Sequence, residues 1–234
     1  MRLIILLFVN FVALHTSFAQ ENLVYFSDAI KSNIKKYNTK SDIEFEKGNI
    51  AEGQALFDSL VQNRLVGSRF DDYSFKSVNS RKVKLSKMGK PVFIITYASW
   101  CVMNKGEIPA LNKLAKKYNK DLQIIVVFWD IKNDIKKISR QFNGNIKVCY
   151  ANESYRNDAK VVATLKHTLG FPTCYFLNSE LDVIDITRGS IPVSKKTPFK
   201  KAIEMNYVVF DARVVDLLAK KDAPVKEQQL ATVD

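Results

Sequence analysis

A tryptophan–cysteine pair stands in the stretch ASWCVMNKGEIPAL, residues 98–111, directly after the apolar run PVFIITY. An apolar run followed by a helical period predicts a buried strand that leads into a helix. Cys101 is therefore expected at the N-terminus of that helix, where free N–H groups and the helix dipole stabilise a thiolate. Only the thiolate attacks a disulfide, so Cys101 is the first candidate nucleophile. The alternative is a small buried hydrophobe, the usual role of a lone cysteine.

The motif lacks a second thiol. Asn104 stands three residues after Cys101, where a Cys-x-x-Cys redox motif carries its second cysteine. No thiol inside the motif resolves a mixed disulfide, which excludes a dithiol reductase cycle there. Asn104 is expected to donate a hydrogen bond to the Cys101 thiolate and so to preserve reactivity without turnover.

The first twenty residues, MRLIILLFVNFVALHTSFAQ, have the pattern of a signal peptide over 1–19. Arg2 supplies the positive charge, residues 3–14 are apolar but short for a membrane span, and Ser17 to Ala19 form the cleavage site. The mature chain is expected in the periplasm or cell envelope, or secreted; an uncleaved N-terminal anchor is the alternative. No later segment approaches eighteen apolar residues, so no integral membrane segment is expected after cleavage.

The formal charge of +12 comes from lysines scattered along the chain. A nucleic-acid partner is not expected, because no recognition motif or single basic face is visible in the sequence. A solvated basic surface that faces an anionic envelope accounts for this composition.

The other two cysteines, Cys149 and Cys174, lie in the strand-like runs IKVCY and TCYFL and are expected in the core. An odd number of cysteines in an exported chain leaves at least one thiol unpaired. Two alternatives stay open. Cys174 resolves a mixed disulfide if its Cα lies within about 7 Å of the Cα of Cys101, or Cys149 and Cys174 form a structural disulfide.

Metal and cofactor sites are not expected. His167 is the only histidine after the signal peptide, and the three cysteines lack metal-ligand spacing. A Cys101–His167 pair for acyl transfer would need a positioned base, and the sequence around LKHTLG gives no sign of one.

The chain divides into the signal peptide, a helical prefix over 20–66, a central α/β domain over 67–190, and a C-terminal helix with a polar tail over 191–234. Apolar residues at helical spacing predict the prefix, with a turn at Gly48-Asn49. The central part begins with a hairpin around Asn79-Ser80 and continues with a strand–helix–strand unit whose strands are 91–97 and 122–129.

The remaining elements follow in alternation. Helices are expected near 132–142 and 155–168, and a strand near 146–150. The strands TCYFL and LDVIDIT are joined by three residues and must therefore be antiparallel, which makes the sheet mixed. Thr197 as N-cap and Pro198 as first helical residue open the last helix. The apolar stripe expected on it consists of Phe199, Ile203, Tyr207, Phe210, Val214 and Leu217.

Residues 90–189 resemble the thioredoxin fold, and specifically the exported TlpA/ResA-like thiol-disulfide oxidoreductases, the redoxins. The motifs that carry this resemblance are ASWC followed by Glu107 and Pro109, the segment Gly170 to Thr173, and VVFWD ending at Asp130. The match covers about half the chain. It implies an α/β fold with a mixed central sheet flanked by helices.

The resemblance also implies roles for individual residues. Cys101 would be the attacking thiol, with Trp100, Phe171 and a cis-Pro172 beside it to bind an extended segment of the substrate. Glu107 would tune proton transfer near the thiol, with a solvated or capping carboxylate as the alternative. Pro109 would kink the active-site helix.

Two departures from the family pattern limit what can be carried over. Asn104 replaces the second cysteine, and Ile95 stands where many thioredoxins keep a buried acid, so the proton relay of that acid is in doubt. A peroxiredoxin-like peroxidase is rejected, because its Pro-x-x-x-Thr-x-x-Cys pattern is replaced by Ile94 and Ala98.

Three hypotheses follow. In the favoured one Cys101 exchanges with, or captures, a client protein that carries a disulfide or thiol, and an external thiol donor releases it. The rival is a catalytically inactive module that binds an extended segment beside Trp100 and Pro172. In the third, the helical ends are the functional surface.

Overall fold

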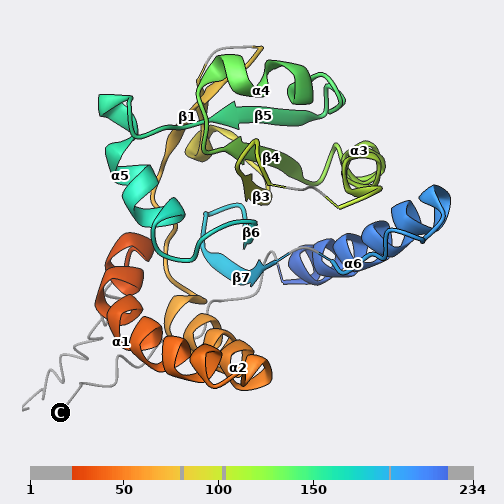
Figure 1. Cartoon of the computed structure of the whole chain (residues 1–234). Helices are drawn as coiled ribbons and strands as arrows, with labels where there is room; N and C mark the ends of the chain where they lie inside the picture. The colour runs from red at the N-terminus through yellow and green to blue at the C-terminus, as the bar shows by residue number, and fades with distance from the viewer. Residues whose placement is uncertain (1–22, 80–81, 102–103, 190, 221–234) are drawn as a thin grey trace, which may run out of the picture.

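The computed structural model of the chain describes residues 23–79, 82–101, 104–189 and 191–220, so the expected signal peptide lies outside it (Figure 1). The α-helices are α1 (Phe26–Glu46), α2 (Ile50–Leu60), α3 (Glu107–Lys117), α4 (Lys132–Ser139), the single turn α5 (Ala159–Val161) and α6 (Phe199–Ala219). The strands are β1 (Ser74–Ser77), β2 (Val83–Lys84), β3 (Val92–Tyr97), β4 (Gln123–Phe128), β5 (Ile146–Tyr150), β6 (Thr173–Leu177) and β7 (Val183–Arg188).

The strands form one mixed sheet in the order β2-β1-β5-β4-β3-β6-β7. The central strands β3, β4 and β5 are parallel, whereas β6 is antiparallel to both β3 and β7. Every residue of β3 and β4 is buried, as their continuous apolar sequences predict for strands covered on both faces. The expected strand–helix–strand unit, the first hairpin and the antiparallel final pair are all confirmed.

Helices cover both faces of this sheet and bury two hydrophobic cores (Figure 1). On one face Phe26 of α1 packs edge-on against Tyr175 of β6, with ring centroids 5.9 Å apart. On the other face Phe93 of β3 lies between Phe176, at 4.7 Å, and Phe210 of α6, at 5.8 Å. The N-terminal helices therefore share a core with the sheet, and their removal would expose it to water.

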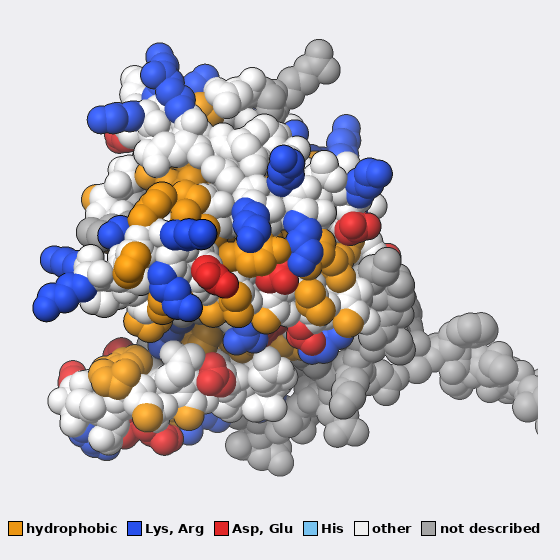
Figure 2. Space-filling model, turned by 90° about the vertical axis from the view of Figure 1, so that its right-hand side faces the viewer, with side chains coloured by type: hydrophobic (Ala, Val, Ile, Leu, Met, Phe, Trp, Pro, Cys, Tyr) orange, Lys and Arg blue, Asp and Glu red, His pale blue; other side chains and the backbone are white. Residues whose placement is uncertain are grey.

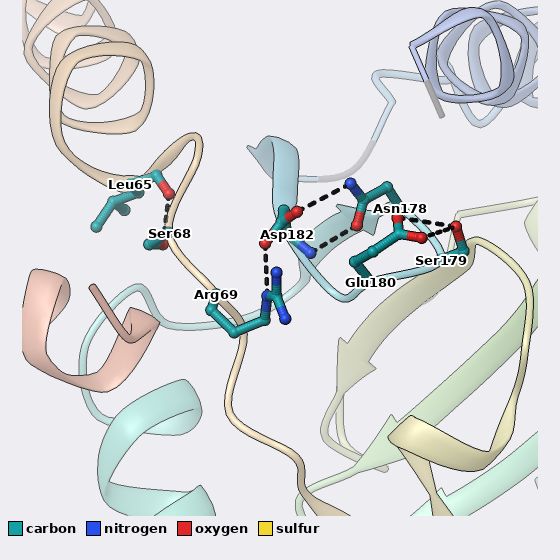
Figure 3. A network of polar contacts seen from close by, with 7 residues as sticks. All are labelled: Leu65, Ser68, Arg69, Asn178, Ser179, Glu180 and Asp182. Atoms are coloured by element: carbon teal, nitrogen blue, oxygen red, sulfur yellow. Dashed lines mark hydrogen bonds and ion pairs between the residues drawn. The ribbon is translucent and has the colours of Figure 1, made fainter. Parts of the chain in front are cut away.

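A polar network attaches the segment after the N-terminal helices to the β6–β7 turn (Figure 3). Arg69 donates to Asp182 at 2.6 Å, and Asn178 both donates to the Asp182 carboxylate, at 3.1 Å, and accepts from its backbone N–H, at 2.7 Å. Because these groups are largely removed from water, their mutual hydrogen bonds offset the cost of burying them.

Two helix boundaries differ from expectation. The helix expected over 155–168 is a series of irregular turns: a 3₁₀ turn, one α turn, and a π-helix over Val162–Lys166. The last helix begins at Phe199 with Pro198, rather than Thr197, as its N-cap, so Phe199 lies at the exposed end of the helix and not in its buried stripe. Among the described residues, no helix is long and apolar enough to cross a membrane.

Candidate functional site

The tryptophan–cysteine pair lies just beyond the carboxyl end of β3, at the edge where reactive groups gather in open α/β sheets. A turn in which the N–H of Cys101 donates to Ala98 O at 2.9 Å places the thiol. Asp130, which follows the neighbouring strand β4, accepts from both the N–H and the hydroxyl of Ser99 at 2.6 Å. These short charge-assisted bonds fix the loop that carries the thiol.

An aromatic surface lies beside Cys101. The side chain of Trp100 is 73% exposed, and its ring meets that of Phe171 edge-on at 5.5 Å. The Phe171–Pro172 peptide bond is cis, as the resemblance implied. The Phe171 ring is half-buried and packs against the core, so the exposed Trp100 ring is the one that can bury apolar area on a partner.

The backbone beside cis-Pro172 is also prepared for a partner. Within the described part of the chain, the N–H and C=O of Phe171 make no hydrogen bond. The carbonyl of Pro172, by contrast, already accepts from the Gly189 N–H at 3.0 Å. Among the described contacts, Phe171 therefore has the backbone groups that are open to pairing with an added extended segment.

Helix α3 does not begin at the thiol. It starts at Glu107, after Gly106 in a left-handed conformation (φ 87°), while Val102 and Met103 lie outside the described residues. The expectation that Cys101 sits on the helix N-terminus is therefore wrong, because Gly106 sets the start of the helix. Pro109 falls in the first turn, where a missing N–H costs no intrahelical bond, so the expected kink is absent.

Asn104 does not serve the thiol in the way expected of it. Its side-chain amide donates to the carbonyl of Ile191, in the segment between β7 and α6. Its own amide oxygen faces Asn206 of α6, whose Nδ2 lies 3.5 Å away and also donates to Lys105 O at 3.3 Å. The residue in place of the second cysteine thus attaches the loop that follows the thiol to the C-terminal part of the chain.

Glu107 is 2% exposed and accepts two hydrogen bonds. The Tyr97 hydroxyl donates to it at 2.5 Å, and the Asn104 N–H at 2.9 Å. It is therefore a buried carboxylate that connects the end of β3 to the loop before α3, and it does not cap the helix. Burial raises the pKa of Glu107, and the bonds from Tyr97 and Asn104 oppose that rise. A carboxyl with a raised pKa, one turn beyond the thiol loop, is suited to hold or release a proton there.

The stability of the Glu107→Gln variant relative to the parent should depend on pH. Because the pKa of Glu107 is higher in the folded state, the folded parent loses stability as pH rises from the unfolded pKa through the folded one. The loss is about 1.4 kcal/mol for each unit of pKa shift. Glutamine does not titrate, so the variant should gain relative to the parent over that interval. Urea unfolding of both proteins between pH 4 and 8 measures their free energies of unfolding. A difference between the two proteins that does not change with pH would contradict this prediction.

The remaining cysteines are core residues, as expected. Cys149 is fully buried, Cys174 is 6% exposed, and all three thiols are free, so the alternative of a Cys149–Cys174 disulfide is wrong. Burial raises the pKa of Cys149 to about 12, and burial also raises that of Cys174. Cys174 lines a cavity of about 160 Å³ together with Glu107 and residues of α6. No metal-binding cluster of side chains occurs among the residues that the structure describes.

Sequence reasoning missed three residues that shape the site. Tyr97 is the last residue of a uniformly apolar strand, which gave no sign of its bond to Glu107. The place of Asp130 could have been predicted from its position after β4. The carboxyl ends of adjacent parallel strands meet at one edge of a sheet, which brings Asp130 close to the loop after β3. Asn206 also carried a signal in the sequence: it is the polar member of the buried stripe of α6.

Comparison with known proteins adds sequence and structural relatives. No family model matches the chain. Thioredoxin-like protein YneN of Bacillus subtilis (strain 168) is 26% identical over 126 residues, which covers 53% of this chain and 72% of that protein. A structure from Chlorobium tepidum, assigned as thiol:disulfide interchange protein DsbE, is 21% identical with a TM-score of 0.49, covering 65% of this chain and 97% of that one. A structure from Bacteroides thetaiotaomicron, assigned as a protein disulfide isomerase, is 18% identical with a TM-score of 0.49, covering 68% and 92%. The sequence relative is itself described as thioredoxin-like.

Proposed function

We propose that this chain, a thioredoxin-fold protein of the redoxin family, uses its single motif thiol, Cys101, for thiol-disulfide exchange or mixed-disulfide capture with client proteins. The observation that carries the proposal is the position of Cys101. It is the partly exposed thiol, between an exposed tryptophan and an unpaired backbone edge, whereas Cys149 and Cys174 are buried. The proposed place of action is the periplasm or cell envelope, or the medium outside, and the signal-peptide pattern over 1–19 supports it.

The exchange proceeds in two displacements. The Cys101 thiolate attacks one sulfur of a client disulfide, forms a Cys101–client disulfide, and releases the other client sulfur as a thiolate that takes up a proton. An external thiol then attacks the client sulfur of this mixed disulfide, and Cys101 leaves as a thiolate. Asn104 cannot take the place of that external thiol, so the mixed disulfide persists until a donor arrives.

Segments of the client would bind along the aromatic surface. An extended strand beside cis-Pro172 pairs with the free N–H and C=O of Phe171, which sets its direction and register. Trp100 covers the strand and excludes water from the reacting sulfurs. Glu107, which Tyr97 holds one turn beyond the thiol loop and whose pKa burial raises, would supply the proton that the departing thiolate takes up.

A peptide that carries one cysteine as a 2-pyridyl disulfide tests the proposal. The reduced protein is expected to displace pyridine-2-thione at least about tenfold faster than glutathione does at the same pH and thiol concentration. Mass spectrometry should locate the peptide on Cys101, and added glutathione should remove it. Cys101→Ser is the blank. A rate no faster than that of glutathione would sink the redox proposal.

The second candidate is a binding module, and the late start of α3 favours it, because the thiol then lacks the helix N-terminus that activates a nucleophile. In that case Cys101→Ser should bind a cysteine-free form of the peptide as tightly as the parent does. Fluorescence reports this directly, since Trp100 is exposed at the site and the other tryptophan, Trp129, is buried.

A further inference from the structure

The segment between β7 and α6 runs along the proposed active site. It leaves β7 beside cis-Pro172, where the N–H of Gly189 donates to Pro172 O at 3.0 Å. It then passes Asn104, whose side chain donates to Ile191 O, and reaches Lys105, whose Nζ donates to Thr197 O at 3.1 Å. The segment therefore lies beside both cis-Pro172 and the loop after the thiol.

This region carries only one sign of charge. Its exposed charged residues, which we call the lysine rim, are Lys105, Lys195, Lys196, Lys200 and Lys201. No aspartate or glutamate occurs between Asp185 and Glu204, and the loop over 98–106 contains none either. Among the described residues, no rim lysine forms an ion pair, whereas lysines elsewhere, such as Lys76 and Lys117, are paired with aspartates. Unpaired like charges at close spacing repel one another and favour a negatively charged partner.

The rim lies beside apolar surface that a peptide would need. Phe199 is 53% exposed at the start of α6, next in the chain to Lys200, and Trp100, next in the chain to Cys101, is exposed as well. Figure 2 shows the side of the molecule on which α3 and α6 lie: basic side chains are interleaved with hydrophobic ones, and acidic ones are fewer. A broad lipid surface would be matched by a uniformly basic face, whereas lysines interleaved with exposed hydrophobic side chains fit an extended acidic chain.

We propose that the lysine rim selects clients in which acidic residues flank the reactive cysteine or disulfide. This inference rests on the proposed function and names its substrate class. Acidic flanking residues raise the local concentration of such clients near Cys101 and so speed their encounter with it. They do not alter the chemical step, in which the Cys101 thiolate bonds to one client sulfur and expels the other as a thiolate, which then takes up a proton.

Two peptides test the role of the lysine rim. Each carries one cysteine as a 2-pyridyl disulfide, and they differ only in whether glutamates or glutamines flank that cysteine. For the parent protein at low ionic strength, the glutamate peptide should react about tenfold faster than the glutamine peptide. Salt should reduce this ratio, because the Debye length falls to about 10 Å at 0.1 M. In a variant with Lys195, Lys196, Lys200 and Lys201 all changed to glutamine, the ratio should fall close to one.

A matched control separates the rim from the overall positive charge of the protein. Changing Lys31, Lys35, Lys36 and Lys40 to glutamine removes the same charge from exposed positions of α1, and this variant should keep most of the ratio. Equal losses in the two variants, or a ratio near one in the parent, would overturn the acidic-client inference while leaving the exchange chemistry intact. A third result would also overturn the acidic-client inference. If the parent binds phosphatidylglycerol vesicles, the rim variant does not, and the ratio of the two peptide rates is near one, the rim binds lipid.

Failure of the exchange itself gives a different result. If neither peptide reacts faster than it does with Cys101→Ser, the proposed function fails. The rim is then tested by Trp100 fluorescence with cysteine-free acidic and neutral peptides. Tighter binding of the acidic peptide that the rim variant loses would support the rim, and equal binding would overturn it.

Discussion

Replacing Cys101 with serine is expected to slow the alkylation of the native protein by at least about a thousandfold. The two thiols that remain are buried, and alkylation of a buried thiol requires an opening that costs about 5 kcal/mol or more in a stable domain. Burial also raises the pKa of Cys149 to about 12 and raises that of Cys174, so both thiols are protonated at neutral pH as long as they are buried. The reactive form, the thiolate, is therefore scarce at both positions.

Iodoacetamide labelling followed by mass spectrometry measures this selectivity. The parent should gain one label under native conditions and three in urea, whereas Cys101→Ser should gain none and then two. The Cys149→Ala variant is the control, because it removes a buried thiol and should keep the native label on Cys101. Rapid native labelling of Cys174 in the serine variant would show that this thiol is accessible, and its role as a resolving cysteine would again need testing.

Much of the sheet could be predicted from the sequence, because several of its strands have residue patterns that can be recognised locally. The runs of β3 and β4 are apolar at every position, and the short connection between β6 and β7 forces an antiparallel pair. The cis-proline beside the thiol and the tryptophan was implied by the resemblance to the redoxins and not by local patterns. The order of the strands, on which that arrangement depends, comes from the structure.

The partners of the polar residues could not be predicted in this way, because they depend on contacts between distant parts of the chain. Asn104 bonds with Ile191, and Asn206 reaches the active-site loop from α6. The local pattern around Asn104 favours a bond to the nearby thiol, and only the packing of α6 directs the amide elsewhere. The irregular turns over 156–166 likewise have a helical sequence pattern, and tertiary contacts decide how it is wound.

The start of α3 shows how the same packing shapes the site. Gly106 adopts a φ of 87°, which residues with a side chain rarely do, and the backbone of α6 approaches it closely. Neither requirement is visible in the sequence KGE. Together they explain why the helix begins beyond the thiol, and they make this glycine the point where α6 and the active-site loop meet.

Changing Gly106 to alanine is expected to destabilise the protein by about 2–5 kcal/mol. A left-handed conformation costs an alanine about 1–2 kcal/mol. The added Cβ would also lie 2.6 Å from the backbone nitrogen of Ile203 and 2.8 Å from the carbonyl carbon of Ala202. These are backbone atoms in a packed helix, so relief requires α6 to move, and overpacking of this kind costs about 1–3 kcal/mol more.

Alanine variants of two other glycines separate the conformational cost from the cost of overpacking against α6. Gly89 has a φ of 63° with nothing within 4 Å of the added Cβ, so its change to alanine should cost only the conformational part, about 1–2 kcal/mol. Gly144 has open space and an ordinary φ, and its variant should stay within about 0.5 kcal/mol of the parent. Urea unfolding of the three variants gives the comparison. If Gly106→Ala costs no more than Gly89→Ala, α6 does not press on the active-site loop, and its hydrogen bonds to Asn104 and Lys105 would not restrain that loop.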